Sequence, residues 1–142
     1  MIINGTRFGQ IEFTEADIIH FDEGLIGFPK LQEFLLVPHK QDSPFRWLQA
    51  VVEPSIAFLV AEPTHFVPDY HPNRANSEET IVLATVSIPP GCPDDMTLNL
   101  AGPILVDGAS RKAKQIVLDD GSYTVRHRVF EKSKSVGEQA AA

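Results

Sequence analysis

The chain has 142 residues, 43% of them hydrophobic and 22% charged, which is the composition of one globular domain able to bury a core. The single cysteine, Cys92, excludes an internal disulfide, and no apolar run approaches the ~20 residues that a membrane helix needs. The formal net charge is −7: residues 1–108 carry 5 Lys/Arg and 15 Asp/Glu, and residues 109–142 carry 7 and 4. With no signal-like segment at the start, we expect a cytoplasmic protein, no membrane contact, and an acidic body that attracts basic partners.

Eleven prolines and nine glycines divide the chain into short segments rich in Ile, Val, Phe and Thr. Alternation and turn residues predict ten strands, at 9–13, 17–21, 34–37, 45–52, 56–61, 81–88, 97–100, 104–107, 115–118 and 123–129. Short helices are predicted at 30–34 and 65–70. The spacing predicts an all-β, mainly antiparallel fold, a single compact β-barrel-like domain over residues 1–130. Residues 131–142 are predicted to form a flexible C-terminal tail.

Two glycines, Gly24 and Gly27, lack the spacing and the strand–helix context of a dinucleotide-binding loop. They predict a turn with positive φ between two strands. Asn99 lies between Leu98 and Leu100 on an apolar segment, where a buried amide must find hydrogen-bond partners. We therefore interpret Asn99 as a structural latch.

The sequence contains no nucleophile elbow and no phosphate-binding loop, and its adjacent carboxylates, such as Asp94 and Asp95, would point to opposite faces of a strand. We therefore expect no enzymatic activity. A metal-dependent hydrolase remains an alternative, because His65, Asp69 and His71 could converge on one ion if residues 65–79 folded back. Solvated loop residues are the preferred interpretation, so no metal and no cofactor is expected.

The positive charges gather in residues 109–142, where Tyr123 and Phe130 could stack on nucleic acid bases. Because the rest of the chain is acidic, we favour a solvated basic face and expect no direct nucleic acid partner. Trp47 is the only tryptophan and shares one face of its strand with Phe45 and Gln49. It fits either a core position or an anchor for a protein partner.

Eight short motifs in a fixed order resemble the bacterial flagellar assembly factor FliW family, from about residue 8 to residue 130. They are Phe21-x-x-Gly-Leu-Ile-Gly-Phe-Pro29, Pro44-Phe-Arg-Trp-Leu-Gln49, Pro54-x-x-Ala-Phe-x-Val60-x-x-Pro63, Pro68-Asp-Tyr70, Thr97-Leu-Asn-Leu100, Pro103-Ile-Leu-Val106, Gln115-Ile-Val-Leu118 and Tyr123-x-x-Arg126. Within them we assign structural roles to Gly24, Gly27, Phe28, Gln49, Asn99 and Pro103.

The resemblance implies a non-enzymatic partner-switching protein that binds newly made flagellin and CsrA, a basic RNA-binding repressor of flagellin translation. We predict partner contacts at Trp47, Asp69, Tyr70, Glu78 and Glu79, and a monomer. The sequence departs from the family pattern at Gly102, where Ala is usual, at Asp107, where Asn is usual, and in the segment after Tyr70. A small-ligand-binding barrel is a further alternative.

Overall fold

The computed structural model describes residues 1–38, 42–72, 80–119 and 121–130. Within them lie eleven strands: β1 Ile2–Thr6, β2 Gly9–Glu12, β3 Ile19–Phe21, β4 Glu33–Pro38, β5 Phe45–Ala50, β6 Ala57–Ala61, β7 Thr80–Ser87, β8 Thr97–Leu98, β9 Ile104–Asp107, β10 Lys112–Gln115 and β11 His127–Arg128. The helical segments there are three-residue 3-10 turns, η1 Glu15–Asp17, η2 Pro63–His65 and η3 Pro93–Asp95. None of the helices in this part of the chain has the length and apolar character needed to cross a lipid bilayer.

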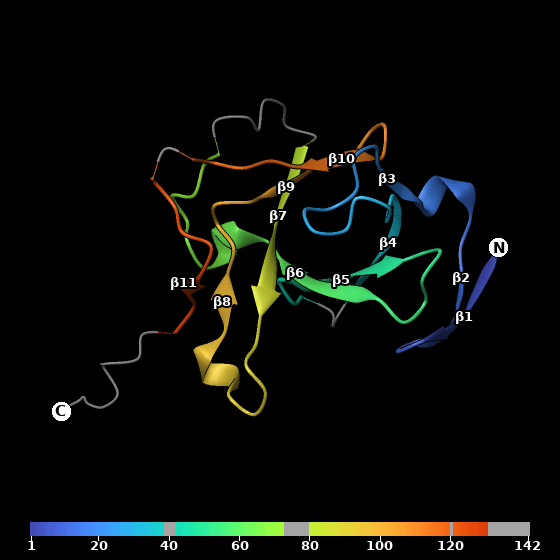
Figure 1. Ribbon diagram of the computed structural model, residues 1–142, viewed down its shortest axis with the longest axis horizontal. Helices are drawn as coiled ribbons and strands as arrows, with labels where there is room; N and C mark the ends of the chain where they lie inside the picture. Colours follow the sequence, from blue (N-terminus) through green and yellow to red (C-terminus); the bar gives the residue numbers. More distant parts are fainter. Residues whose placement is uncertain (39–41, 73–79, 120, 131–142) are drawn as a thin grey trace.

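Seven strands close into a barrel-like sheet in the order β7-β6-β5-β4-β3-β10-β9, with β9 pairing back onto β7 (Figure 1). All of these pairs are antiparallel except β3 with β10, which run parallel. β7 continues past the barrel to pair with β8, and β8 pairs with β11. The predicted all-β, mainly antiparallel, barrel-like fold is confirmed.

The interior of the barrel is filled by alternate side chains from all seven strands, because successive residues on a strand point to opposite faces. The largest of them are fully buried: Phe21 and Phe34, whose rings meet edge to face at 5.3 Å, together with Ile19, Leu48, Leu83 and Ile104. A second apolar cluster lies outside the barrel, where Ala61, Ala84, Leu98 and Leu100 pack around Tyr70.

The hairpin of β1 and β2 forms a separate two-stranded sheet that packs on the outer face of the barrel (Figure 1). Its Ile3 joins Phe13, Ile18 and Leu35 in a third apolar cluster. The Met1 ammonium donates a hydrogen bond to the Phe13 carbonyl oxygen at 2.8 Å, which holds the start of the chain beside the residue that follows β2.

Several predicted elements are wrong in detail. Residues 30–34 are not helical, because the Phe21 N–H binds the Gln32 carbonyl oxygen and holds this segment extended beside β3. Residues 65–70 contain only the end of η2 followed by a turn, since Pro63 and Pro68 leave no room for a longer helix. The strand predicted at 115–118 is β10 at Lys112–Gln115, and the strand predicted at 123–129 is reduced to β11.

Candidate partner-contact surface

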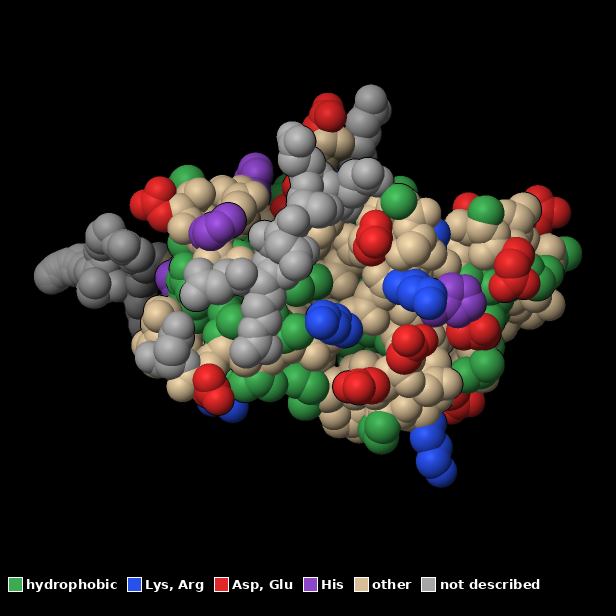
Figure 2. Space-filling view, turned by 90° about the horizontal axis from the view of Figure 1, so that it is seen from above, with side chains coloured by type: hydrophobic (Ala, Val, Ile, Leu, Met, Phe, Trp, Pro, Cys, Tyr) green, Lys and Arg blue, Asp and Glu red, His purple; other side chains and the backbone are tan. Residues whose placement is uncertain are grey.

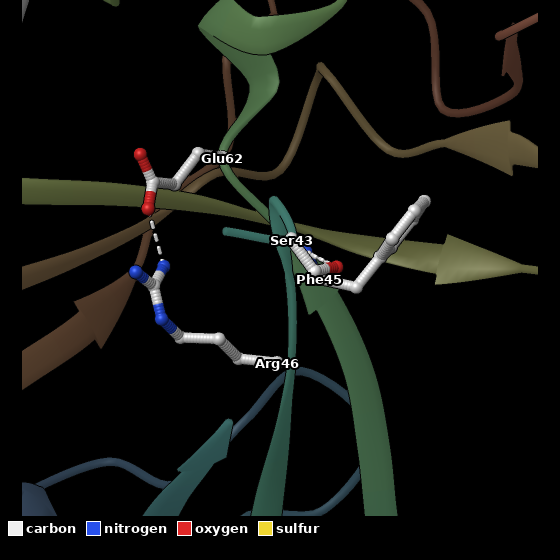
Figure 3. A network of polar contacts seen from close by, with 4 residues as sticks. All are labelled: Ser43, Phe45, Arg46 and Glu62. Atoms are coloured by element: carbon white, nitrogen blue, oxygen red, sulfur yellow. Dashed lines mark hydrogen bonds and ion pairs between the residues drawn. The ribbon is translucent and has the colours of Figure 1, made fainter. Parts of the chain in front are cut away.

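The segment after β6 carries several of the predicted contact residues, and both of its ends are fixed. At its start, Arg46 on β5 makes an ion pair with Glu62 (Figure 3). The Glu62 N–H donates a hydrogen bond to the Pro44 carbonyl oxygen at 3.1 Å. In the same view the Ser43 hydroxyl accepts the Phe45 N–H at 3.1 Å, which orders the entry to β5. Because both side chains of the pair are partly exposed, it contributes less than about 1 kcal/mol and acts mainly on geometry.

Tyr70 fixes the other end of this segment. Its side chain is 4% exposed, its hydroxyl donates to the Leu100 carbonyl oxygen at 2.6 Å, and its ring meets Tyr123 edge to face at 4.6 Å. Burial, with a smaller effect of the neighbouring Tyr123, raises the pKa of the Tyr70 phenol well above its ordinary value. The structure therefore gives Tyr70 a packing role, and its ring offers no surface to a partner in this conformation.

Asp69, next to Tyr70, is exposed, as the predicted contact role requires. His65 and His71 are also exposed, and the described residues contain no group of three His, Cys, Asp or Glu side chains that could hold a metal ion. The metal site predicted as an alternative from His65, Asp69 and His71 is therefore not assembled. Glu78 and Glu79 lie outside the described residues.

Trp47 lies apart from this segment, on the outer face of β5 beneath the β1–β2 turn. The Arg7 guanidinium lies 4.0 Å from the centroid of the Trp47 ring system, and the Phe8 ring meets it edge to face at 5.8 Å. The indole is half-buried and belongs to none of the three apolar clusters. Trp47 is therefore neither a core residue nor a fully exposed anchor for a partner: it lies outside the core and is partly covered by Arg7 and Phe8.

The Gly24–Phe28 loop is a tight turn closed by hydrogen bonds in both directions between Leu25 and Phe28, at 2.7 and 3.3 Å. Gly24 has φ +69° and Gly27 has φ +90°, the positive values that the sequence predicted. A Cβ on Gly24 would meet the Phe28 carbonyl oxygen at 2.5 Å, so this position requires glycine for space as well as for φ. The turn leaves Ile26 57% exposed and Phe28 41% exposed.

Two side-chain amides hold the turn after β8, and one of them, Gln115, also connects it to this loop. The Asn99 Oδ1 atom accepts the backbone N–H groups of Ala101 and Gly102 at 3.2 and 2.9 Å, so Asn99 caps the turn. Gln115 accepts the Ile26 N–H at 3.0 Å and donates to the Gly102 carbonyl oxygen at 2.9 Å. We call Asn99, Gly102, Gln115 and Ile26 the amide latch.

Sequence reasoning missed the role of Gln115, because its bond to Ile26 joins residues 89 positions apart. The parallel pairing of β10 with β3, the strand that leads into this loop, brings the two together, and no local pattern signals it. Gly102 stands where the family usually has Ala. A Cβ at this position would lie 2.9 Å from the Asn99 Nδ2 atom and 3.3 Å from the Gln115 Nε2 atom, so glycine gives both amides room.

The two remaining residues with an assigned structural role, Gln49 and Pro103, are buried. Gln49 is completely enclosed, and its Nε2 atom donates to the carbonyl oxygens of Pro54 at 2.9 Å, Ala50 at 3.0 Å and Ile56 at 3.2 Å, closing the β5–β6 turn. Pro103 is buried beside the amide latch, and its carbonyl oxygen accepts the Ile116 N–H at 3.0 Å. Both side chains thus support the scaffold.

A hollow of about 710 Å³ lies over β9 and β10 and is lined by charged side chains, among them Asp22, Glu23, Asp107, Lys112 and Lys114. Figure 2 shows one face of the molecule, on which Lys and Arg side chains lie among Asp and Glu side chains. Small-molecule sites are mostly apolar and enclosed, with a few convergent polar groups. This open, charged hollow does not have that character, which weakens the small-ligand alternative.

The closed barrel, the enclosed motif residues and the exposed loop side chains define a class of small closed β-barrel proteins. A model described as "FliW protein" matches residues 2–129. A crystal structure of the flagellar assembly factor FliW superposes with a TM-score of 0.84 and 28% identity, covering 93% of this chain and 99% of that one.

Relatives described as flagellar assembly factor FliW agree with this match. The one from Magnetococcus marinus is 44% identical over 132 residues, covering 86% of this chain and 82% of the relative. The one from Moorella thermoacetica is 36% identical over 148 residues, covering 97% and 94%. The chain belongs to the FliW family.

Proposed function

We propose that this protein acts in flagellar assembly by binding other proteins, and that its partners are newly made flagellin and the translational repressor CsrA. The observation that carries the proposal is the match to the FliW family over residues 2–129, together with relatives described as flagellar assembly factors. In this mechanism flagellin and CsrA compete. When flagellin leaves for secretion, the freed protein binds CsrA, and flagellin mRNA is translated again.

The charge distribution supports the CsrA half of the proposal. Residues 1–108 carry 15 acidic and 5 basic side chains, so the barrel attracts a basic protein and repels the RNA that competes for it. A negative field beside a partner's RNA-binding surface lowers RNA affinity without covering that surface. The field acts over roughly 8–10 Å at physiological salt, so the effect weakens as ionic strength rises.

Of the three acidic residues predicted as contacts, Asp69 is the one that lies within the described residues, and it is exposed on a segment held at both ends. Glu78 and Glu79 remain proposed contacts of the same kind. Trp47 is proposed as a contact through the part of its half-buried side chain that remains accessible. Tyr70 supports this surface from below by fixing the backbone next to Asp69.

The proposal further holds that the protein is a cytoplasmic monomer without enzymatic activity, and that residues 1–130 form its working domain. Among the described residues no His, Cys, Asp or Glu cluster is built for a metal, and the motif amides are used in backbone hydrogen bonds. Such a scaffold suits binding, with its side chains committed to holding loops in place.

Calorimetric titration of the purified protein with CsrA and with flagellin from the same organism, each alone and then in competition, tests the proposal. We expect binding to both at micromolar concentration or below, with flagellin displacing CsrA. The substitution Asp69→Asn should reduce the affinity for CsrA more at low salt than at high salt. Binding to neither partner would refute the proposal. Binding to flagellin alone would refute the part of the proposal that assigns CsrA as a partner.

A further inference from the structure

One hollow of about 280 Å³ lies between the Gly24–Phe28 loop and the barrel wall, and we call it the β6–β7 groove. Ile26 and Phe28 form its outer lip, Phe58 and Leu59 of β6 form one wall, and Val86 and Ser87 of β7 form the other. The two exposed lip residues leave an apolar lip uncovered beside the polar side chains of Ser87, Asn99 and Gln115. Surfaces of this kind mark sites of protein interaction.

The groove exists because two strands diverge. β6 and β7 pair only at Val60–Thr85 and Ala61–Ala84, and β7 then pairs with β8 through Val86 and Ser87. Figure 1 shows β7 turning away from the β5–β6 hairpin as it runs toward β8. Beside the point of divergence, the side chains of Phe58, Leu59, Thr85 and Val86 line the groove and are half-buried, so they are accessible from it.

The lip is held in place before any partner arrives. Gln115 binds the Ile26 N–H, Gly24 allows the close turn, and the Phe28 ring packs edge to face against Phe58 at 5.1 Å. A surface that is already ordered loses less conformational entropy on binding, which favours affinity. The amide latch thus has a use beyond stability, because it presents an apolar side chain to solvent in a fixed position.

The groove carries no charge in an otherwise acidic protein. None of the ten described residues that line it is Asp, Glu, Lys or Arg, and its floor offers the Asn99 and Gln115 amides. A basic segment would find no counter-charge there and would lose hydration on entry. An uncharged apolar segment has no charge hydration to lose, and it gains by burying its side chains against Ile26 and Phe28.

We propose that the β6–β7 groove is the docking site for an apolar segment of unassembled flagellin, and that CsrA binds the neighbouring acidic surface, so that the two proteins exclude each other without sharing the groove. The inference rests on the proposed function, since it assigns a surface to one of its two partners. A subunit that has not yet entered a filament leaves the apolar core of its assembly interfaces exposed, and this is the chemistry that the groove fits.

The test uses the full-length protein with a charge placed on either side of the groove. Ile26→Asp changes the lip, and Ser87→Glu changes the opposite wall at a side chain that is already polar and exposed. Val52→Asp is the matched control, because Val52 is 62% exposed, like Ile26 at 57%, and does not line the groove. Thermal unfolding of each variant confirms that it is folded before titration with monomeric flagellin and with CsrA.

We expect Ile26→Asp and Ser87→Glu to weaken flagellin binding by at least about tenfold, the equivalent of one lost apolar side-chain contact. CsrA binding should be unchanged in both, and Val52→Asp should bind both partners like the unmodified protein. Folded variants that keep full flagellin affinity would overturn the assignment of the groove. An equal loss of CsrA affinity would overturn its selectivity for flagellin. If the unmodified protein bound neither partner, the proposed function itself would fail, and the groove assignment with it.

Discussion

Replacing Gly24 with alanine should destabilise the protein much more than the same replacement at Gly27, three residues along the same loop. Both glycines have positive φ, +69° and +90°, so both variants share the backbone cost of about 1–2 kcal/mol. At Gly27 no heavy atom lies within 4 Å of the added Cβ. The added Cβ at Gly24 would lie 2.5 Å from the Phe28 carbonyl oxygen and 2.6 Å from that of Pro29.

These obstacles are backbone atoms, so the Gly24→Ala loop must move to accept the methyl group. Overpacking of this kind costs about 1–3 kcal/mol in addition to the backbone term. We therefore expect Gly24→Ala to lower the free energy of unfolding by about 2–5 kcal/mol, and Gly27→Ala by about 1–2 kcal/mol. The reduced entropy of the unfolded chain is the same in both variants and cancels in the comparison.

Urea denaturation followed by circular dichroism measures both values, provided that the slope of the transition is unchanged. The loop also carries the lip of the β6–β7 groove, so Gly24→Ala should weaken flagellin binding as well. Equal destabilisation by the two substitutions would refute the reasoning, since it would mean that the space around Gly24 is not limiting.

Tyr70→Phe leaves the Leu100 carbonyl oxygen without its buried donor, so urea denaturation should show a loss of about 1–3 kcal/mol at pH 7. Burial raises the pKa of the Tyr70 phenol, so its contribution to the free energy of unfolding is complete below the ordinary tyrosine pKa and is lost as the pH rises above that value. The difference in stability between the two proteins should therefore shrink at alkaline pH. A difference that stays constant with pH would contradict this account. Gln115→Ala removes the hydrogen bonds to Ile26 and Gly102, and we expect faster amide exchange at Ile26 in hydrogen-exchange mass spectrometry, whereas unchanged protection would refute the latch. Arg7→Ala uncovers the only tryptophan, Trp47, so its fluorescence emission should shift to longer wavelength with a stability change below about 1 kcal/mol, and an unshifted spectrum would mean that Arg7 does not cover the ring in solution.

The sequence by itself determined the fold class, the strand-rich segments and the glycine turn. Short, strand-rich segments bounded by turn residues are a local property, so β5 at Phe45–Ala50 and β6 at Ala57–Ala61 could be predicted from the sequence. Gly24 and Gly27 were predictable for the same reason, since positive φ is a requirement of the turn itself. Asn99 was predicted as a latch from one amide in an apolar segment, and it caps the turn after β8.

Only the tertiary structure decided how far each strand extends and which side chains remain outside. β10 was misplaced because its alternating lysines hide the pattern, and its bounds follow from pairing with β3 and β9. Tyr70 looked like an interface residue, yet Leu100 and Tyr123, distant in the chain, enclose it. The β6–β7 groove arises from the divergence of two strands and the bond between Gln115 and Ile26. Such features depend on contacts between residues far apart in sequence, which local patterns do not encode.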